Sequence, residues 1–386
     1  MALTVSDLFK ESAKYHMKLL AGKNGLNNLV YWVHIIETIE SVRFLRGNEL
    51  VITEGILENE EGRLLSFVEK LFLQNASALV VNTGMFIKKI PDCVIAFCDE
   101  KGFPLFSIPW EVPLVDVTRE YSQRIMDNSV KEDTIVTTFK NLIFGTGDKE
   151  TQIHQMERYG YLSASTMLFL CFSLELEKGT EEFVNKSRKL KSLAERLAKM
   201  IKNQYISFEY QERRIVVLID YTQEEIDAYI DRIFKELSGN KLLSDIYIGL
   251  GDNIKGMEHQ NVNFMRAYAS CQIARRKQER VLGYQELGLY KLLVNIENAD
   301  VLEDFHNNSF GKLIKYDEEN GTDYYKFIKT YIECDGHQGA VSDKLFIHRN
   351  TVNNYIKRIE EILDMDLLSW EGKAKLYVAY CIENVL

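Results

Sequence analysis

Apolar residues in the first part of the chain alternate between short continuous runs and longer helical patterns. The pattern predicts strands at 29–36, 49–53 and 78–81 and helices at 58–75 and 91–101. Strand–helix–strand alternation requires crossover connections, so we expect a largely parallel sheet. All four prolines fall between residues 91 and 113, where they indicate turns and strand edges near the end of one unit.

A second pattern begins near Ser163, after a segment at 116–143 that predicts a long connecting helix because it contains neither proline nor glycine. The predicted elements are a strand at 166–172, a helix at 181–203, a hairpin of 205–210 with 214–220, a helix at 223–237, a strand at 246–250, a helix at 259–278 and a strand at 281–282. This order is typical of a ferredoxin-like or nucleotide-cyclase-like half sandwich.

The last part of the chain has an almost entirely helical pattern. Helices are predicted at 300–308, 323–333, 338–345, 349–363 and 370–384. The fold class is therefore multidomain, with an N-terminal α/β domain, an α+β ferredoxin-like or cyclase-like middle domain and an all-α C-terminal domain. The expected boundaries are 1–125, a linker helix at 126–160, 161–290 and 300–386.

Composition narrows the classes of function. The 386 residues carry a net charge of -10, which excludes a protein that coats nucleic acid through bulk positive charge but leaves room for a local basic face. The six cysteines are scattered without a CxxC pair, and no histidines or cysteines have zinc-ligand spacing. We expect no metal and no cofactor. The longest uncharged runs are shorter than about 18 residues, so we expect neither a targeting nor a membrane segment, and a cytoplasmic location.

The most informative segment is residues 338–363, where a short helix, a tight turn and a longer helix predict a helix-turn-helix. At about 100° per residue, Val352, Tyr355, Ile356 and Ile359 share one side of the second helix, and a polar sector of Arg349, Asn350, Asn353, Asn354 and Lys357 occupies another. Arginine can bond guanine twice, and asparagine can do the same with adenine. Small Ala340 is expected to let the two helices approach closely.

The alternative is an ordinary amphipathic helix with a solvated face. Residues 321–386 have 8 basic and 10 acidic side chains, which counts against binding to a polyanion. The charge is uneven, however, because residues 337–358 have a net charge of +3. The edge that would face DNA is therefore positive, as binding in a groove requires.

The motif LFIHRNTV at 345–352, followed by IKRIEEIL at 356–363, resembles the C-terminal helix-turn-helix of PucR/CdaR-type bacterial transcription regulators. The motifs TVSDL at 4–8, WVH at 32–34, LRGNELVIT at 45–53 and IPWEVP at 108–113 are similar to the purine-catabolism-regulator domain of that family. The middle unit resembles the degenerate GGDEF-like, or cyclase-like, domain found between them. The resemblance covers essentially the whole chain.

The resemblance implies a sequence-specific regulator of transcription. Its expected partners are double-stranded DNA, a small-molecule effector such as a purine, a ureide or another catabolic intermediate, and further copies of the chain in a homodimer or higher homo-oligomer. The expected DNA-binding residues are Lys344, His348, Arg349, Asn350, Thr351, Asn353, Asn354 and Lys357. Members of the family usually have more basic residues just after the valine, where this chain has Asn353, Asn354 and Tyr355. This departure leaves the operator sequence open, and fewer charges predict fewer phosphate contacts and a gentler salt dependence.

An effector is expected at the carboxyl ends of the N-terminal strands, where open parallel sheets bind ligands. The candidate residues are Thr53, Asn82 and Thr83, with Arg46 and Glu49 near a strand start. Arg46 is suited to an anionic or ureide-like ligand, and the alternative is a surface ion pair.

Two other classes of function remain open, namely a nucleotide cyclase or phosphodiesterase and a protein-interaction scaffold. The segment 208–214, which would be the catalytic hairpin of a diguanylate cyclase, has no glycine and sets two carboxylates beside two arginines. We therefore expect no enzyme. The segment 249–251 is interpreted as a simple turn rather than a phosphate loop, and Trp32 and Trp370 as core residues.

Overall fold

The structure is a computed structural model that describes residues 2–10, 12–55, 63–177, 179–239, 246–296 and 298–385. Its chain divides into two compact units. The first comprises Met1–Ile246 with Asn253–Phe264, and the second comprises Tyr247–Asp252 with Met265–Leu386. Within the described residues, no helix is both long and apolar enough to cross a bilayer.

The N-terminal sheet of the first unit has five strands in the order β2-β7-β6-β5-β4. These strands are β2 (Lys18–Ala21), β4 (Trp32–Ile35), β5 (Glu49–Thr53), β6 (Ala78–Thr83) and β7 (Leu105–Pro109). Strands β4 to β7 are parallel, and β2 joins β7 in the antiparallel sense. The predicted strands at 49–53 and 78–81 and the largely parallel sheet are confirmed; β2 was not predicted.

The predicted single strand at 29–36 is wrong, because the chain changes partners at Tyr31. Strand β3 (Leu29–Val30) pairs antiparallel with β1 (Leu3–Thr4), whereas β4 pairs parallel with β5. The Tyr31 amide donates to the carbonyl of Asn48, 2.9 Å away, at the point where the chain leaves one sheet for the other. A continuous apolar run carries no sign of such a change.

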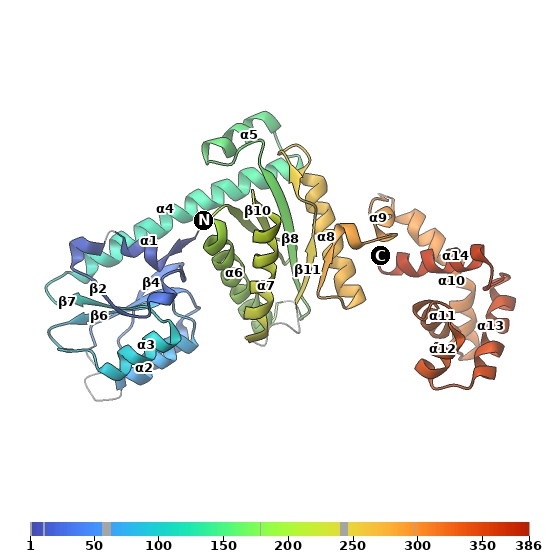
Figure 1. The fold of residues 1–386 in the computed structure, drawn as a ribbon, viewed down its shortest axis with the longest axis horizontal. Helices are drawn as coiled ribbons and strands as arrows, with labels where there is room; N and C mark the ends of the chain where they lie inside the picture. Colours follow the sequence, from blue (N-terminus) through green and yellow to red (C-terminus); the bar gives the residue numbers. More distant parts are fainter. Residues whose placement is uncertain are drawn as a thin grey trace. The chain divides into compact units, whose positions relative to one another are not determined.

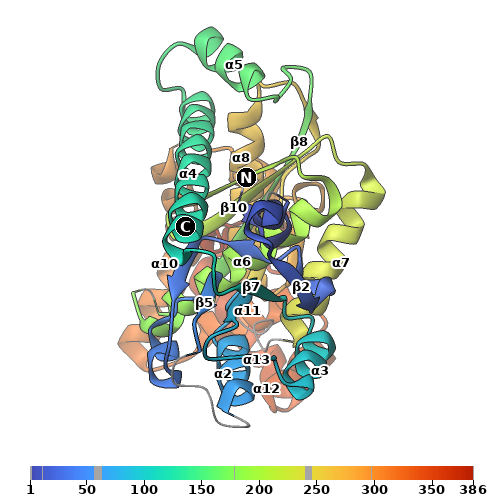
Figure 2. The same ribbon diagram turned by 90° about the vertical axis from the view of Figure 1, so that its left-hand side faces the viewer.

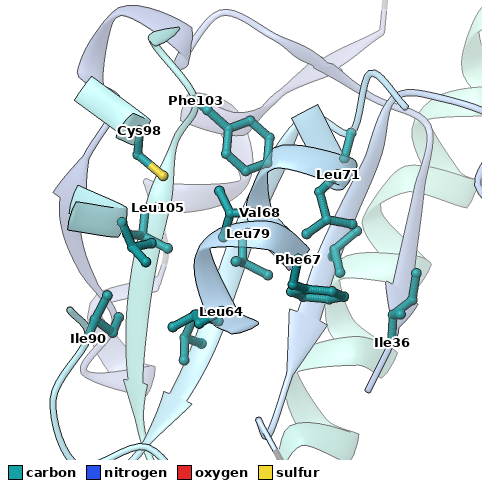
Figure 3. Packing of buried hydrophobic residues seen from close by; sticks show 14 of the residues in the cluster. Ile36, Leu64, Phe67, Val68, Leu71, Leu79, Ile90, Cys98, Phe103 and Leu105 are labelled. Atoms are coloured by element: carbon teal, nitrogen blue, oxygen red, sulfur yellow. The ribbon is translucent and has the colours of Figure 1, made fainter. Parts of the chain in front are cut away.

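Helices cover both faces of the N-terminal sheet (Figure 2). On one face, α2 (Arg63–Leu73) and α3 (Asp92–Lys101) enclose a cluster around Phe67, Val68 and Leu79 (Figure 3). On the other, α1 (Val5–Phe9) and the start of α4 pack on alternate residues of the same strands. Both crossover helices were predicted, although part of the range 58–75 lies outside the described residues.

Helix α4 (Leu114–Phe144) is the predicted long connecting helix, and its 31 residues span about 46 Å. Its first turns contribute Val117 and Tyr121 to the core of the N-terminal sheet. Farther along, Phe139 stacks on Phe169 of the next sheet, with ring centroids 5.9 Å apart. Figure 1 shows α4 as one long helix between the N-terminal sheet and the sheet of β8 and β10. The helix ends at Gly145, where φ is +69°, and α5 (Lys149–Arg158) follows. The predicted linker at 126–160 is therefore not one helix.

The middle of the chain contains the elements predicted for it, in the predicted order. They are β8 (Thr166–Leu174), α6 (Glu181–Lys202), β9 (Tyr205–Tyr210), β10 (Arg213–Ile219), α7 (Gln223–Gly239), β11 (Ile246–Leu250), α8 (Gln260–Lys277) and β13 (Val281–Gly283). Strand β10 lies antiparallel between β8 and β9, and the unpredicted β12 (Ile254–Lys255) pairs with β8. Strands β11 and β13 are parallel neighbours.

The interpretation of 249–251 as a simple turn is wrong for Gly249, which lies inside β11, within the strand predicted at 246–250. A Cβ atom there would come within 2.1 Å of the Cys271 amide nitrogen and 2.3 Å of the Ala267 carbonyl oxygen. Both groups belong to α8, so the glycine allows the helix backbone to approach the strand.

The remaining helices of the second unit are α9 (Tyr290–Leu293), α10 (Ala299–Asn320), α11 (Tyr324–Glu333), α12 (Gln338–Leu345), α13 (Arg349–Leu363) and α14 (Trp370–Glu383). The predicted helix at 300–308 was too short, because Phe310 and Leu313 continue its buried stripe. The helix stops at Gly321, where φ is +63°. Its apolar side joins α11, α12, α13 and α14 in one core.

Candidate nucleic-acid interface

The turn between α12 and α13 is fixed by backbone geometry and local hydrogen bonds. Phe346 ends α12 in the left-handed region, with φ of +54°, and the Ser342 hydroxyl donates to the Ile347 carbonyl at 2.6 Å. His348 caps α13, since its Nδ1 accepts the Asn350 amide at 3.2 Å. The helix-turn-helix predicted at 338–363 is present, and these contacts hold the turn that joins its two helices.

One side of α13 packs into the hydrophobic core of the C-terminal helices. Val352, Ile356 and Ile359 are buried, and Val341 of α12 is buried beside them. Tyr355 lies edge-on to Tyr324 of α11, with ring centroids 5.0 Å apart. The predicted inner face of α13 is confirmed. The prediction for Ala340 is wrong: it is exposed, and Val341 makes the close contact instead.

The opposite side of α13 presents free polar side chains. Arg349, Asn350, Asn353, Asn354 and Lys357 are all exposed, and none of these side chains has a hydrogen-bond or ionic partner among the described residues. They span about 140° of the helix surface at 100° per residue. Exposed amide and guanidinium groups that the protein leaves unused are available for base edges.

The other basic side chains of the motif are held by the protein itself. Lys344 binds Glu333 at 2.8 Å, a contact that raises the pKa of the lysine. Arg358 donates to the Tyr316 hydroxyl at 3.2 Å and to Glu361 at 2.5 Å, and both contacts raise the pKa of the arginine. Lys344 was predicted to bind DNA, yet in this structure it is part of an ion pair.

Two exposed aromatic side chains near the motif were not recognised from the sequence. Phe346 is 94% exposed and Trp370 is 89% exposed. Trp370 was predicted to be a core residue, as was Trp32, which is 48% exposed; both predictions are wrong. The signal available for Phe346 was its place in the predicted turn between the two helices, where chain connections usually lie at the surface.

The candidate effector residues lie at two different ends of the N-terminal sheet. Thr53 and Asn82 are buried at the carboxyl ends of β5 and β6, and Thr83 follows Asn82. Glu49 begins β5 and lies at the other end with Arg46. The five residues therefore do not form one site.

At the carboxyl ends, the Thr53 hydroxyl donates to Glu37 at 3.1 Å, and Thr83 donates to the Ile108 carbonyl at 3.3 Å. The Asn82 side-chain oxygen is buried and has no hydrogen-bond partner within the part of the chain that the structure describes. At the other end, Glu49 accepts the Arg46 amide at 2.7 Å, whereas the Arg46 side chain is exposed. Asn82, Arg46 and the second carboxylate oxygen of Glu49 therefore have no partner among the described residues, and Asn82 lies at the opposite end of the sheet from the other two.

The β9–β10 hairpin turns through Gln211 and Glu212, whose φ values are +46° and +60°. Arg214 donates to Glu209 at 3.2 Å, so this carboxylate is neutralised by its neighbour in the hairpin. Among the residues that the structure describes, no cluster of three or more histidine, cysteine, aspartate or glutamate side chains is placed to hold a metal ion.

Family models match both ends of the chain. Residues 7–125 match the purine catabolism regulatory protein-like family, and residues 324–382 match the PucR C-terminal helix-turn-helix domain. The chain carries both of these PucR-type domains. The second match contains α11 to α14 completely except for the last residue of α14, and thus the whole helix-turn-helix.

Curated relatives of the chain are transcriptional activators of Bacillus subtilis. A proline-responsive transcriptional activator of Bacillus subtilis, PutR, is 24% identical over 172 residues, which are 42% of each chain. The DNA-binding transcriptional activator AdeR of the same organism is 24% identical over 41% of this chain and 38% of its own. The matched stretches thus cover less than half of these relatives.

A solved regulator of polyketide synthase expression from Bifidobacterium adolescentis is 17% identical, with a TM-score of 0.32. The alignment covers 65% of this chain and 98% of that one. A likeness at this level supports no statement about the middle domain, whose cyclase-like fold stays a prediction.

Proposed function

We propose that this protein is a sequence-specific, double-stranded DNA-binding regulator of transcription that uses α13 as its reading helix. The observation that carries the proposal is the pair of faces on α13, one packed into the core and the other lined with exposed, unengaged arginine, asparagine and lysine side chains. The similarity to PutR and AdeR, both transcriptional activators, supports the same role. We expect it to act in the cytoplasm, where bacterial DNA is found.

Within this proposal the side chains have different tasks. Arg349, Asn350, Asn353 and Asn354 would contact base edges in the major groove, because their groups match guanine and adenine. Lys357 would contact phosphate. The start of α13, with His348 and Thr351, would lie against the sugar-phosphate backbone of the DNA, because a helix N-terminus attracts anions. Lys344 would contact DNA only after its ion pair with Glu333 is broken.

A second copy of the chain is the expected partner, since helix-turn-helix proteins bind paired half-sites about one helical turn apart. Val115, Met126 and Val130 are exposed on α4 and lie within about 60° of one another around the helix. Antiparallel pairing centred between residues 122 and 123 would set Val115 of one copy opposite Val130 of the other. Such self-complementarity is what a two-fold interface requires.

An effector would act through the N-terminal sheet and α4. The helix belongs to two cores, so a ligand that favours one arrangement of α4 would change the population of DNA-binding dimers. If Arg46 is the ligand's contact, Arg46→Ala should remove the effector response and leave DNA binding intact. An unchanged calorimetric titration with the effector would reject this role.

The experiment for the proposal is a DNA-binding selection with the purified full chain and sheared genomic DNA at low ionic strength. We expect enrichment of discrete fragments with a shared, two-fold symmetric sequence. The absence of any retained fragment would reject DNA binding and favour a scaffold. Hydrolysis or cyclisation of GTP with magnesium would favour the enzyme, against which the glycine-free hairpin and the Glu209–Arg214 pair stand.

A further inference from the structure

Phe346, in the turn of the helix-turn-helix, differs from the other residues that share its left-handed backbone conformation. Ten non-glycine residues in the part of the chain that the structure describes have a positive φ. Nine of them are histidine, asparagine, aspartate, glutamine or glutamate, and Phe346 is the only apolar one. Asparagine and aspartate tolerate this region, whereas a bulky apolar residue in it is an outlier. Such an outlier points to a role outside the local backbone.

The Phe346 side chain is also the most exposed large hydrophobic side chain that the structure describes. The turn as a whole does not explain this exposure, because Leu345 and Ile347 on either side are partly buried against the core of the C-terminal helices. Hydrogen bonds hold the turn, since the Ile347 amide donates to the Ser342 carbonyl at 3.1 Å. The phenyl ring therefore adds no burial to the fold, although the backbone disfavours it at this position.

Phe346 lies at the end of α13 that would enter DNA in the proposed function. It precedes the cap residue His348 by two positions and Arg349, the first residue of α13, by three. In helix-turn-helix proteins the N-terminal residues of the second helix contact base edges in the major groove. An exposed side chain in the turn at this end of α13 is therefore within reach of the same groove.

Charge distinguishes Phe346 from Trp370, the other strongly exposed aromatic residue near the motif. Phe346 belongs to the segment 337–358, whose net charge is +3. Trp370 belongs to the segment 359–371, which has no lysine or arginine and carries the carboxylates of Glu360, Glu361, Asp364, Asp366 and Glu371. The first segment attracts a polyanion and the second repels it. DNA is therefore the partner that fits Phe346, and Trp370 is expected to lie away from it.

We propose that Phe346 is a specificity-determining residue that packs against the methyl group of a thymine in the major groove. This methyl group is the apolar feature of the base edges there, and phenylalanine is among the side chains that contact it. A phenyl ring has no hydrogen-bond donor for phosphate, so its contribution depends on the base sequence. The inference rests on the proposed function and adds a base contact to those of the polar side chains of α13.

The expected contribution of Phe346 is that of one buried methyl group in each half-site. Burial of one such group corresponds to about fourfold in affinity. If the two half-sites contribute independently, loss of both contacts lowers affinity by roughly 15-fold. Removal of the phenyl ring leaves the phosphate contacts in place, so the slope of affinity against salt should not change.

The test uses the purified full chain and the duplex that wild type enriches most strongly from randomised DNA. Deoxyuridine replaces each thymine in turn, which removes only the methyl group, and fluorescence anisotropy measures the affinity. We expect a thymine at which this replacement weakens wild type about fourfold and leaves Phe346→Gly unaffected. If no thymine shows this difference, the proposal is overturned while DNA binding stands. If no duplex is bound at all, the proposed function and this inference are both rejected.

Two controls separate this contact from folding and from aromatic character in general. Without DNA, Phe346→Gly should melt at a temperature at least as high as wild type, because glycine adopts the left-handed region without strain. A clearly lower melting temperature would assign Phe346 to the fold and overturn the proposal. Trp370→Gln should keep the affinity of wild type and its response to deoxyuridine. If Trp370→Gln loses the same thymine response as Phe346→Gly, the response does not belong to the turn and the proposal fails.

Discussion

Mutation of two adjacent basic residues on α13 should affect DNA binding differently. Lys357 is exposed without a partner among the described residues, whereas Arg358 is bound to Tyr316 and Glu361. Only a cation that the protein leaves free can release counterions from DNA at no cost to another contact. We therefore expect Lys357→Ala to weaken binding to every sequence and to reduce its salt dependence, and Arg358→Ala to do neither.

The size of the difference follows from counterion release. Each phosphate contact contributes about 0.9 to the slope of log K against log salt on duplex DNA. A fourfold rise in salt, from 50 to 200 mM, therefore lowers affinity about 3.5-fold for each contact. Loss of Lys357 should remove one such factor per bound copy, and loss of Arg358 none.

Fluorescence anisotropy of a labelled duplex, titrated at four or five salt concentrations, measures both slopes. Circular dichroism must show that each variant retains its helices, since Arg358→Ala also removes a contact to α10. Equal slopes for Lys357→Ala and wild type, or a larger loss for Arg358→Ala, would refute the assignment of free and engaged cations.

Three further outcomes follow from particular contacts. Glu333→Gln should release Lys344 and steepen the salt dependence of DNA binding by about one contact, measured in the same titration. Burial acts to raise the pKa of Asp7, but the Lys199 ammonium and the Thr4 donors hold it well below its usual value. Its stabilisation is therefore present above about pH 4 and is lost as the pH falls, so wild type should lose its advantage in melting temperature over Asp7→Asn in acid. Gly249→Ala should lower the melting temperature by several degrees, because its Cβ would meet the backbone of α8, and unchanged melting would contradict that packing.

The periodic part of the fold could be predicted from the sequence. The inner face of α13 followed from the spacing of Val352, Ile356 and Ile359, and the parallel strands followed from apolar runs between helices. The predictions that failed concern positions where tertiary contacts determine the local structure. The strand at 29–36 splits because Tyr31 hydrogen-bonds to a neighbouring chain segment. The interpretation of 249–251 as a turn missed that Gly249 is needed inside the strand, where the backbone of α8 approaches it.

At the candidate nucleic-acid interface, too, the sequence shows the periodic features but not the tertiary contacts. The polar sector of α13 was visible in the sequence, but the engagement of Arg358 and Lys344 was not, because their partners Tyr316 and Glu333 lie 42 and 11 residues away.

The most direct test of α13 as a reading helix is the sequence preference of the Asn353→Ala and Asn354→Ala variants. Both, and wild type, are put through a selection with a randomised duplex and sequencing of the bound pool. The account predicts that each variant keeps its overall affinity for DNA within a few-fold but loses preference at a defined base pair in each half-site. An unchanged preference in both variants would contradict insertion of this face of α13 into the major groove.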